Sequence, residues 1–79
     1  MQAPDFNEVF ENIYKGTPER LSKLRDEKGV SKDEVAKVTG IGAKTIYFLE
    51  TGRQKPTVSV LLSLSEYYNK SMNWLITGS

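Results

Sequence analysis

The chain has 79 residues, of which 38% are hydrophobic, and a formal net charge of +1. It contains no cysteine, which excludes disulfides and thiolate metal sites, and no histidine, the commonest other metal ligand and general base. The sequence lacks the run of roughly 18 apolar residues that a membrane span requires, and its start lacks the pattern of a signal peptide. We therefore expect one small cytoplasmic domain with no membrane partner.

Residues 5–15 have the apolar spacing of an amphipathic helix, which would end at Gly16. The apolar positions are Phe6, Val9, Phe10, Ile13 and Tyr14. Each such side chain is worth about 1.5–3 kcal/mol when fully buried, so we expect this stripe to pack on something. Two alternatives are open, a contact with a second copy of the chain and a cap over the core of the same chain.

The next helix is predicted over residues 17–28. Thr17 is a suitable N-cap and Pro18 would occupy the first helical position.

Residues 31–52 predict two short helices, over about 32–39 and 43–51, with a break at 39–42. Ser31 is followed three residues later by a glutamate, which is the S-x-x-E capping box. The two glycines of the break favour a tight turn. This layout is that of a helix-turn-helix, although a helical hairpin with a purely structural role has the same caps and spacing.

The second of these helices has an inner stripe formed by Ile46 and Leu49, and Gly52 would end it. Two further helices follow, over 58–68 and 72–77, with Thr57 and Ser71 as their N-caps. Trp74 is expected to be partly exposed. The expected core consists of Leu21, Leu24, Val30, Val35, Ala36, Ile41, Ile46, Leu49, Val58, Leu61, Leu62, Leu64, Tyr68, Met72, Leu75 and Ile76.

The order and spacing of several short motifs resemble the Cro/phage-repressor family of helix-turn-helix proteins, also called the Xre type. The resemblance covers about residues 18–78. Its matching pieces are Leu21-x-x-Leu24-Arg25-x-x-Lys28-Gly29-Val30-Ser31, Val35-Ala36, Gly40-Ile41, Thr45-Ile46, Leu49-Glu50-x-Gly52, Lys55-Pro56 and Asn73-Trp74-Leu75-Ile76-x-Gly78.

The resemblance implies an all-α fold, a compact five-helix Cro/repressor-like helix-turn-helix domain over 17–79. Residues 1–16 would add an N-terminal amphipathic helix. The implied function is a sequence-specific transcriptional regulator, a repressor of phage or mobile-element type. Its partner would be double-stranded DNA, and it would bind a two-fold operator as a homodimer. The acidic N-terminal segment is a poor DNA contact, so we expect it to contribute to dimerisation, with the last helix around Trp74 as the competing surface.

The second helix of the motif would enter the major groove. With Ile46 and Leu49 turned inward, the resemblance implies four base-reading positions, Ala43, Lys44, Tyr47 and Phe48. The chain departs from the usual pattern here, because it has Gly42 where a capping serine or threonine is common and an aromatic residue at position 48. Phe48 is equally suited to partial burial against the helix over 58–68, and a protein interface is a third role for it.

Basic side chains gather in the same region, since residues 35–65 carry four of them and only one acidic residue. The expected phosphate contacts are Lys32, Thr45, Arg53, Gln54, Lys55 and Thr57. The resemblance also implies a partly buried ion pair between Arg25 and Glu50, with a structural role.

A catalytic function has almost no support. The serines lack a histidine partner, and the neighbouring carboxylates at 26–27 and 33–34 would not face one another on a helix. We expect no enzyme activity, no cofactor, no metal site and no small-molecule substrate. The main alternative function is a protein-binding helix-turn-helix, such as an antitoxin or an antirepressor partner, whose Tyr47–Phe48 face would bind protein.

Overall fold

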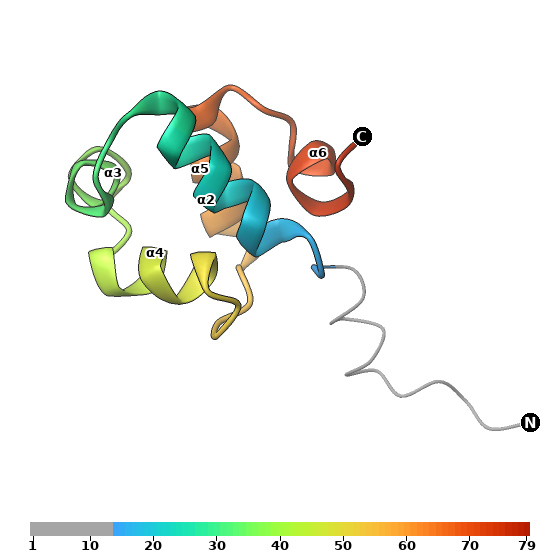
Figure 1. The fold of residues 1–79 in the computed structure, drawn as a ribbon, viewed down its shortest axis with the longest axis horizontal. Coiled ribbons are helices and arrows are strands. Elements are labelled where there is room, and N and C mark those ends of the chain that lie inside the picture. The colour runs from blue at the N-terminus through green and yellow to red at the C-terminus, as the bar shows by residue number, and fades with distance from the viewer. Residues whose placement is uncertain (1–13) are drawn as a thin grey trace, which may run out of the picture.

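The computed structural model describes residues 14–79, and this part of the chain is entirely helical (Figure 1). Its five helices are α2 (Thr17–Lys28), α3 (Lys32–Thr39), α4 (Ala43–Glu50), α5 (Val58–Tyr68) and α6 (Met72–Thr77). The all-α, five-helix prediction for the domain is confirmed. The predicted N-terminal helix lies outside the described residues except for Tyr14 and Lys15, which lie in a turn rather than a helix.

Three of the four predicted side-chain caps are confirmed. The hydroxyls of Ser31, Thr57 and Ser71 each accept a hydrogen bond from the backbone N–H three residues later, at 3.1, 3.2 and 3.0 Å. Each bond satisfies one of the backbone donors that a helix start leaves unpaired.

The predicted cap at Thr17 is wrong. The N-cap of α2 is Gly16, and Thr17 is the first helical residue. Its side chain is 1% exposed and its hydroxyl donates to the backbone carbonyl of Leu75 in α6 at 2.8 Å. A buried hydroxyl requires a partner, and here the partner comes from α6, a helix that is distant in the sequence but packs against α2.

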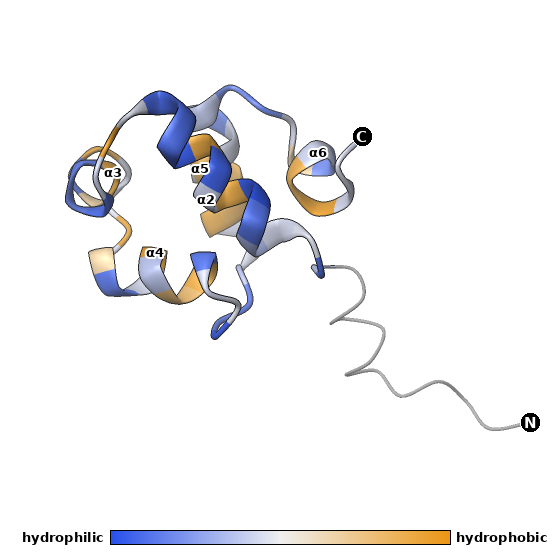
Figure 2. Ribbon diagram, viewed as in Figure 1, coloured by the Kyte–Doolittle hydropathy of each residue, from blue (hydrophilic) through white to orange (hydrophobic). Residues whose placement is uncertain are grey.

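The core lies where α2, α4, α5 and α6 face one another, with one residue from α3, and Figure 2 shows the hydrophobic colouring of α5 behind α2. Its buried members are Leu21, Leu24, Val35, Ile46, Leu49, Leu61, Leu64 and Leu75. Val30, Ala36, Ile41, Tyr68, Met72 and Ile76 are partly buried against it, as is Trp74.

Two core predictions are wrong, because Val58 is 71% exposed and Leu62 is 50% exposed. The two residues are four positions apart and therefore share a face of α5. Leu61 and Leu64 are the buried residues of this helix. The face that carries Val58 and Leu62 is rotated about a third of a turn around the helix axis from this buried face. The apolar residues of α5 thus lie on two faces of the helix, of which only one belongs to the core.

Candidate nucleic-acid interface

Helices α3 and α4 form the helix-turn-helix unit, which lies at the opposite end of the domain from α6 (Figure 1). Residues 40–42 join them, so the predicted bounds of the first helix and the predicted start of the second are confirmed. Gly40 has a φ of 78°, a left-handed conformation that favours glycine, and its N–H donates to the carbonyl of Ala36 at 2.9 Å. Gly42 has an ordinary extended conformation and caps α4 without a side-chain hydrogen bond.

Burial fixes which side of α4 faces outward. Ile46 is 3% exposed and Leu49 is 2% exposed, so this stripe faces the core as predicted. Lys44 and Tyr47 lie on the outer side, and the Tyr47 side chain is 39% exposed. The remaining outward candidates, Ala43 and Phe48, are half-buried. The partial burial of Phe48 is compatible with packing inside the domain and also leaves part of its ring accessible to DNA or to a protein partner.

Cations lie over the two aromatic rings of α4. The Nζ atom of Lys44 is 5.6 Å from the centre of the Phe48 ring. The Tyr47 ring has two such neighbours, the Nζ atom of Lys32 at 5.9 Å and the guanidinium carbon of Arg53 at 5.5 Å. These distances are within the range of cation–π attraction. The outer face of α4 is thus both aromatic and positively charged.

The loop after α4 folds back onto the end of the helix. The backbone N–H groups of Arg53 and Gln54 both donate to the carbonyl of Phe48, at 2.9 and 3.2 Å. Gly52 makes the turn with a φ of 77°, as expected for a glycine that ends a helix. Arg53 thereby lies beside the Tyr47 ring of α4, whereas the exposed Gln54 and Lys55 line a groove that also includes Pro18 of α2.

The other two residues predicted to contact phosphate are placed differently. Thr57 is exposed, but its hydroxyl oxygen already accepts the capping hydrogen bond from Val60. Thr45 is half-buried in the first turns of α4.

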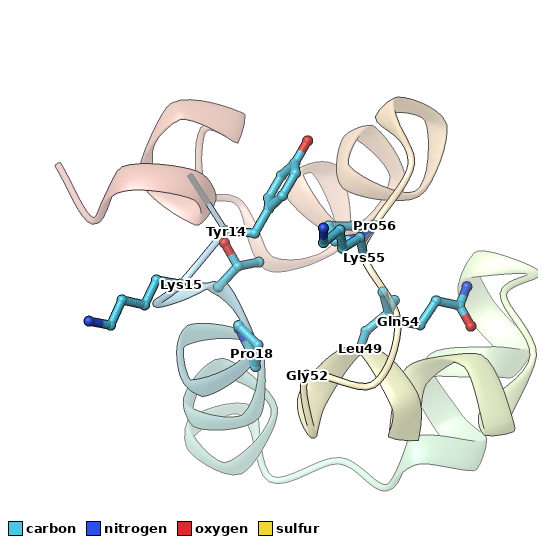
Figure 3. Close-up of a pocket in the computed structure, with 9 residues that line it drawn as sticks. Tyr14, Lys15, Pro18, Leu49, Gly52, Gln54, Lys55 and Pro56 are labelled. Atoms are coloured by element: carbon cyan, nitrogen blue, oxygen red, sulfur yellow. The ribbon is translucent and has the colours of Figure 1, made fainter. Parts of the chain in front are cut away.

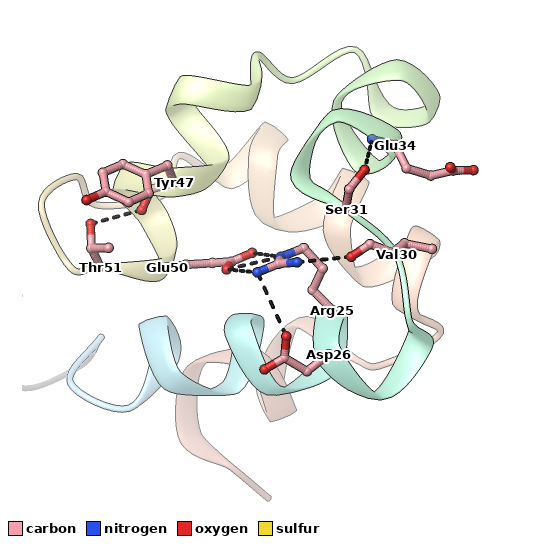
Figure 4. Close-up of polar contacts among 8 residues, drawn as sticks. All are labelled: Arg25, Asp26, Val30, Ser31, Glu34, Tyr47, Glu50 and Thr51. Carbon is pink, nitrogen blue, oxygen red and sulfur yellow. Dashed lines mark hydrogen bonds and ion pairs between the residues drawn. The ribbon is translucent and has the colours of Figure 1, made fainter.

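Arg25 and Glu50 form an ion pair that joins α2 to the last residue of α4 (Figure 4). Their closest atoms, Nε and Oε2, are 2.8 Å apart, and their side chains are 14% and 5% exposed. Hydrogen bonding to the Glu50 carboxylate raises the pKa of Arg25 above its ordinary value. The pair lies beneath the outer face and holds α4 in place.

A groove of about 170 Å³ lies between the start of α2 and the loop that follows α4 (Figure 3). Its apolar lining residues are Tyr14, Pro18, Leu49 and Pro56, and Lys15, Thr17, Gln54 and Lys55 supply its polar groups. The groove is smaller than the usual sites for drug-sized ligands. None of the described residues that line it is a carboxylate.

A helix-turn-helix family model matches residues 21–75, which is more than half of the chain. The chain belongs to the Xre/Cro-type helix-turn-helix family. It is 36% identical to an uncharacterized HTH-type transcriptional regulator of Sinorhizobium fredii over 57 residues, 72% of this chain and 74% of the relative. It is 30% identical to another, from Archaeoglobus fulgidus, over 50 residues, 63% of this chain and 71% of the relative. No solved structure matches the chain.

The Xre/Cro-type family is a group of DNA-binding transcription regulators. In the described part of this member, residues 14–79, no helix is long and apolar enough to cross a membrane.

The sequence did not indicate that the cations of Lys32 and Arg53 both lie near the ring of Tyr47. These residues come from α3, the loop after α4 and α4 itself, so no local spacing rule could have paired them.

Proposed function

We propose that this chain is a sequence-specific DNA-binding transcriptional regulator, acting as a repressor of phage or mobile-element type on a two-fold operator. One observation carries the proposal: the exposed side of α4 is surrounded by the cations of Lys32, Lys44 and Arg53. A positively charged helix face of this kind suits the anionic groove of duplex DNA.

In the proposed complex, the N-terminal part of α4 enters the major groove. Lys44 donates to the O6 and N7 acceptors of a guanine, and the methyl group of Ala43 contacts a thymine methyl. Tyr47 and Phe48 complete the base-reading face. The phosphate contacts come from Lys32 at the start of α3, Thr45 in α4, residues 53–55 in the loop, and Thr57.

A two-fold operator presents two half-sites about 34 Å apart, so the proposed repressor acts as a dimer. The exposed pair on α5, Val58 and Leu62, supports a contact between two copies through this helix. We favour this α5 surface over α6, the helix around Trp74, as the dimer contact. Trp74 is half-buried there, with the Lys70 Nζ atom 4.9 Å from its ring centre, which leaves less apolar area for a partner. We also propose that the N-terminal segment contributes to dimerisation.

The test is selection of bound duplexes from a random DNA pool with the intact protein, followed by a salt titration on the recovered duplex. We expect a recurring motif with two-fold symmetry, and a logarithm of the binding constant that falls linearly with the logarithm of salt concentration. Retention of no duplex at low salt would contradict the proposal and favour the protein-binding alternative, in which the Tyr47–Phe48 face meets a protein.

A further inference from the structure

The three cations around α4 are held by aromatic rings rather than by carboxylates. Lys32, Lys44 and Arg53 form no salt bridge with any acidic side chain in the described part of the chain, residues 14–79. By contrast, the exposed Lys23 of α2 pairs with Glu27 at 3.9 Å. The charge of the three cations is therefore not neutralised within this part of the protein, which leaves them available to an anion.

Tyr47 connects two of these cations across the helix-turn-helix unit. Lys32 is the first residue of α3, and Arg53 lies in the loop beyond the end of α4, yet both charges lie within 6 Å of the one ring. The two positive groups repel each other, and the negative face of the ring offsets part of this repulsion. Phosphate groups of a DNA backbone that runs past the ring would neutralise these charges.

We propose that Tyr47 is a positioning residue for phosphate binding, whose ring holds Lys32 and Arg53 together as one site for the DNA backbone. This inference rests on the proposed function and changes the role of one residue within it. The ring, not the hydroxyl, carries the effect, so Tyr47 strengthens binding to every DNA sequence instead of selecting a base. The backbone contributes to this geometry, because the Thr51 hydroxyl donates to the Tyr47 carbonyl at 2.9 Å and Arg53 N–H donates to the adjacent Phe48 carbonyl.

The test uses the full chain and two labelled duplexes, one recovered by selection and one of random sequence. Tyr47→Phe keeps the ring and is expected to bind both duplexes like the wild type. Tyr47→Leu removes the ring, and we expect affinity for both duplexes to fall by about two- to fivefold for each cation released. The dependence on salt should also become less steep, because fewer phosphate contacts are made.

A double-mutant cycle tests whether the ring and the cations act together. Lys32→Gln and Arg53→Gln should each reduce affinity less in the Tyr47→Leu background than in the wild type. Lys28→Gln is the matched control, since its Nζ atom lies 5.0 Å from the ring centre of Tyr67, a residue of α5. That variant should leave DNA affinity unchanged. Melting temperatures of the variants show whether each one is folded. Because Tyr47 is 39% exposed, we expect its substitution to leave the fold intact.

Several results would overturn the inference. Equal losses in Tyr47→Phe and Tyr47→Leu would assign the effect to the hydroxyl. A loss confined to the selected duplex would assign it to base reading, and additive effects would show that the ring does not hold the cations. A wild-type protein with no salt-dependent binding to either duplex would overturn the proposed function and this inference together.

Discussion

The guanidinium group of Arg25 makes a two-pronged contact with the carboxylate of Glu50, with Nε 2.8 Å from Oε2 and Nη2 3.1 Å from Oε1. Its remaining nitrogen, Nη1, donates to the backbone carbonyl of Val30 at 3.0 Å. One side chain of α2 thus fixes both the end of α4 and the chain segment that leads into α3 (Figure 4). The proposed DNA-binding helix is therefore positioned by a contact that lies away from its outer face.

Arg25→Ala should lower the free energy of unfolding by about 3–5 kcal/mol, because it leaves the Glu50 carboxylate largely buried without its partner. Arg25→Ala combined with Glu50→Gln should recover part of the loss. Lys23→Ala is the control, since its pair with Glu27 is exposed, and it should change stability by no more than about 0.5 kcal/mol. Urea denaturation measures all three variants, and a loss in Arg25→Ala no larger than in the control would contradict the prediction.

Thr17→Val removes a hydroxyl but keeps the shape of the side chain. The lost bond joins α2 to the Leu75 carbonyl of α6 in a position that is 1% exposed. Arg20 also donates to this carbonyl, at 3.2 Å, so the acceptor keeps one partner. We expect a loss of about 1 kcal/mol in unfolding free energy. Thr51→Val removes an exposed hydroxyl that donates to the Tyr47 carbonyl. An equal loss in both variants would show that burial of the Thr17 bond is unimportant.

Thr17 also illustrates which features a sequence can and cannot predict. The caps at Ser31, Thr57 and Ser71 involve partners three residues away, so local spacing was enough to identify them. Thr17 has the same residue type at a helix start, but its partner is 58 positions away. A long-range partner replaced the local cap, and only the packed structure identifies it.

The same distinction applies to the surface. The inner stripe of α4 was predictable because Ile46 and Leu49 follow helical spacing, whereas α5 has apolar residues on two faces and spacing alone did not distinguish them. The Arg25–Glu50 pair was expected only through the family resemblance. The cations around Tyr47 were not expected, because they depend on how two segments meet α4.

Stability should fall at high pH because of Tyr68. Burial, and next the nearby Glu50 carboxylate, raise the pKa of Tyr68 from 10.0 to about 12. The folded protein then keeps the phenolic proton at pH values where the unfolded chain loses it. This contribution to stability is fully present below pH 10 and is lost as the pH rises from 10 to about 12.

Tyr68→Phe should therefore make the decline in unfolding free energy between pH 10 and 12 shallower than in the wild type. Tyr67→Phe is the control for loss of a neighbouring hydroxyl, since the two rings are 4.9 Å apart between centres. Urea midpoints measured across this pH range give the comparison. Parallel curves for the wild type and Tyr68→Phe would contradict the assignment to Tyr68.

The proposed dimer predicts that polar substitutions on α5 weaken self-association. Burial of an apolar side chain contributes about 1.5–3 kcal/mol, so Leu62→Ser should raise the dimer dissociation constant roughly tenfold or more. Val58→Ser should act in the same direction. Val38→Ser changes a residue of α3 that is 62% exposed and serves as the control. Sedimentation equilibrium measures the constants, and removal of residues 1–13 tests that segment separately. Unchanged association in both α5 variants would exclude this face.

The last prediction separates base reading from phosphate binding. Lys44→Ala should weaken binding to the selected duplex by roughly 1–3 kcal/mol and relax the preference at one base-pair position, because its exposed ammonium group is the best placed donor on α4. Lys55→Ala should weaken binding to all sequences alike and make the salt dependence less steep.

Repeating the pool selection with each variant distinguishes these outcomes, and Lys37→Ala, an exposed lysine of α3, is the control for loss of a positive charge. The two lysines differ in what their ligands encode, since a guanine edge carries sequence information and a phosphate does not. If the motif recovered with Lys44→Ala matched that of the wild type, the outer face of α4 would not be the surface that reads the DNA sequence.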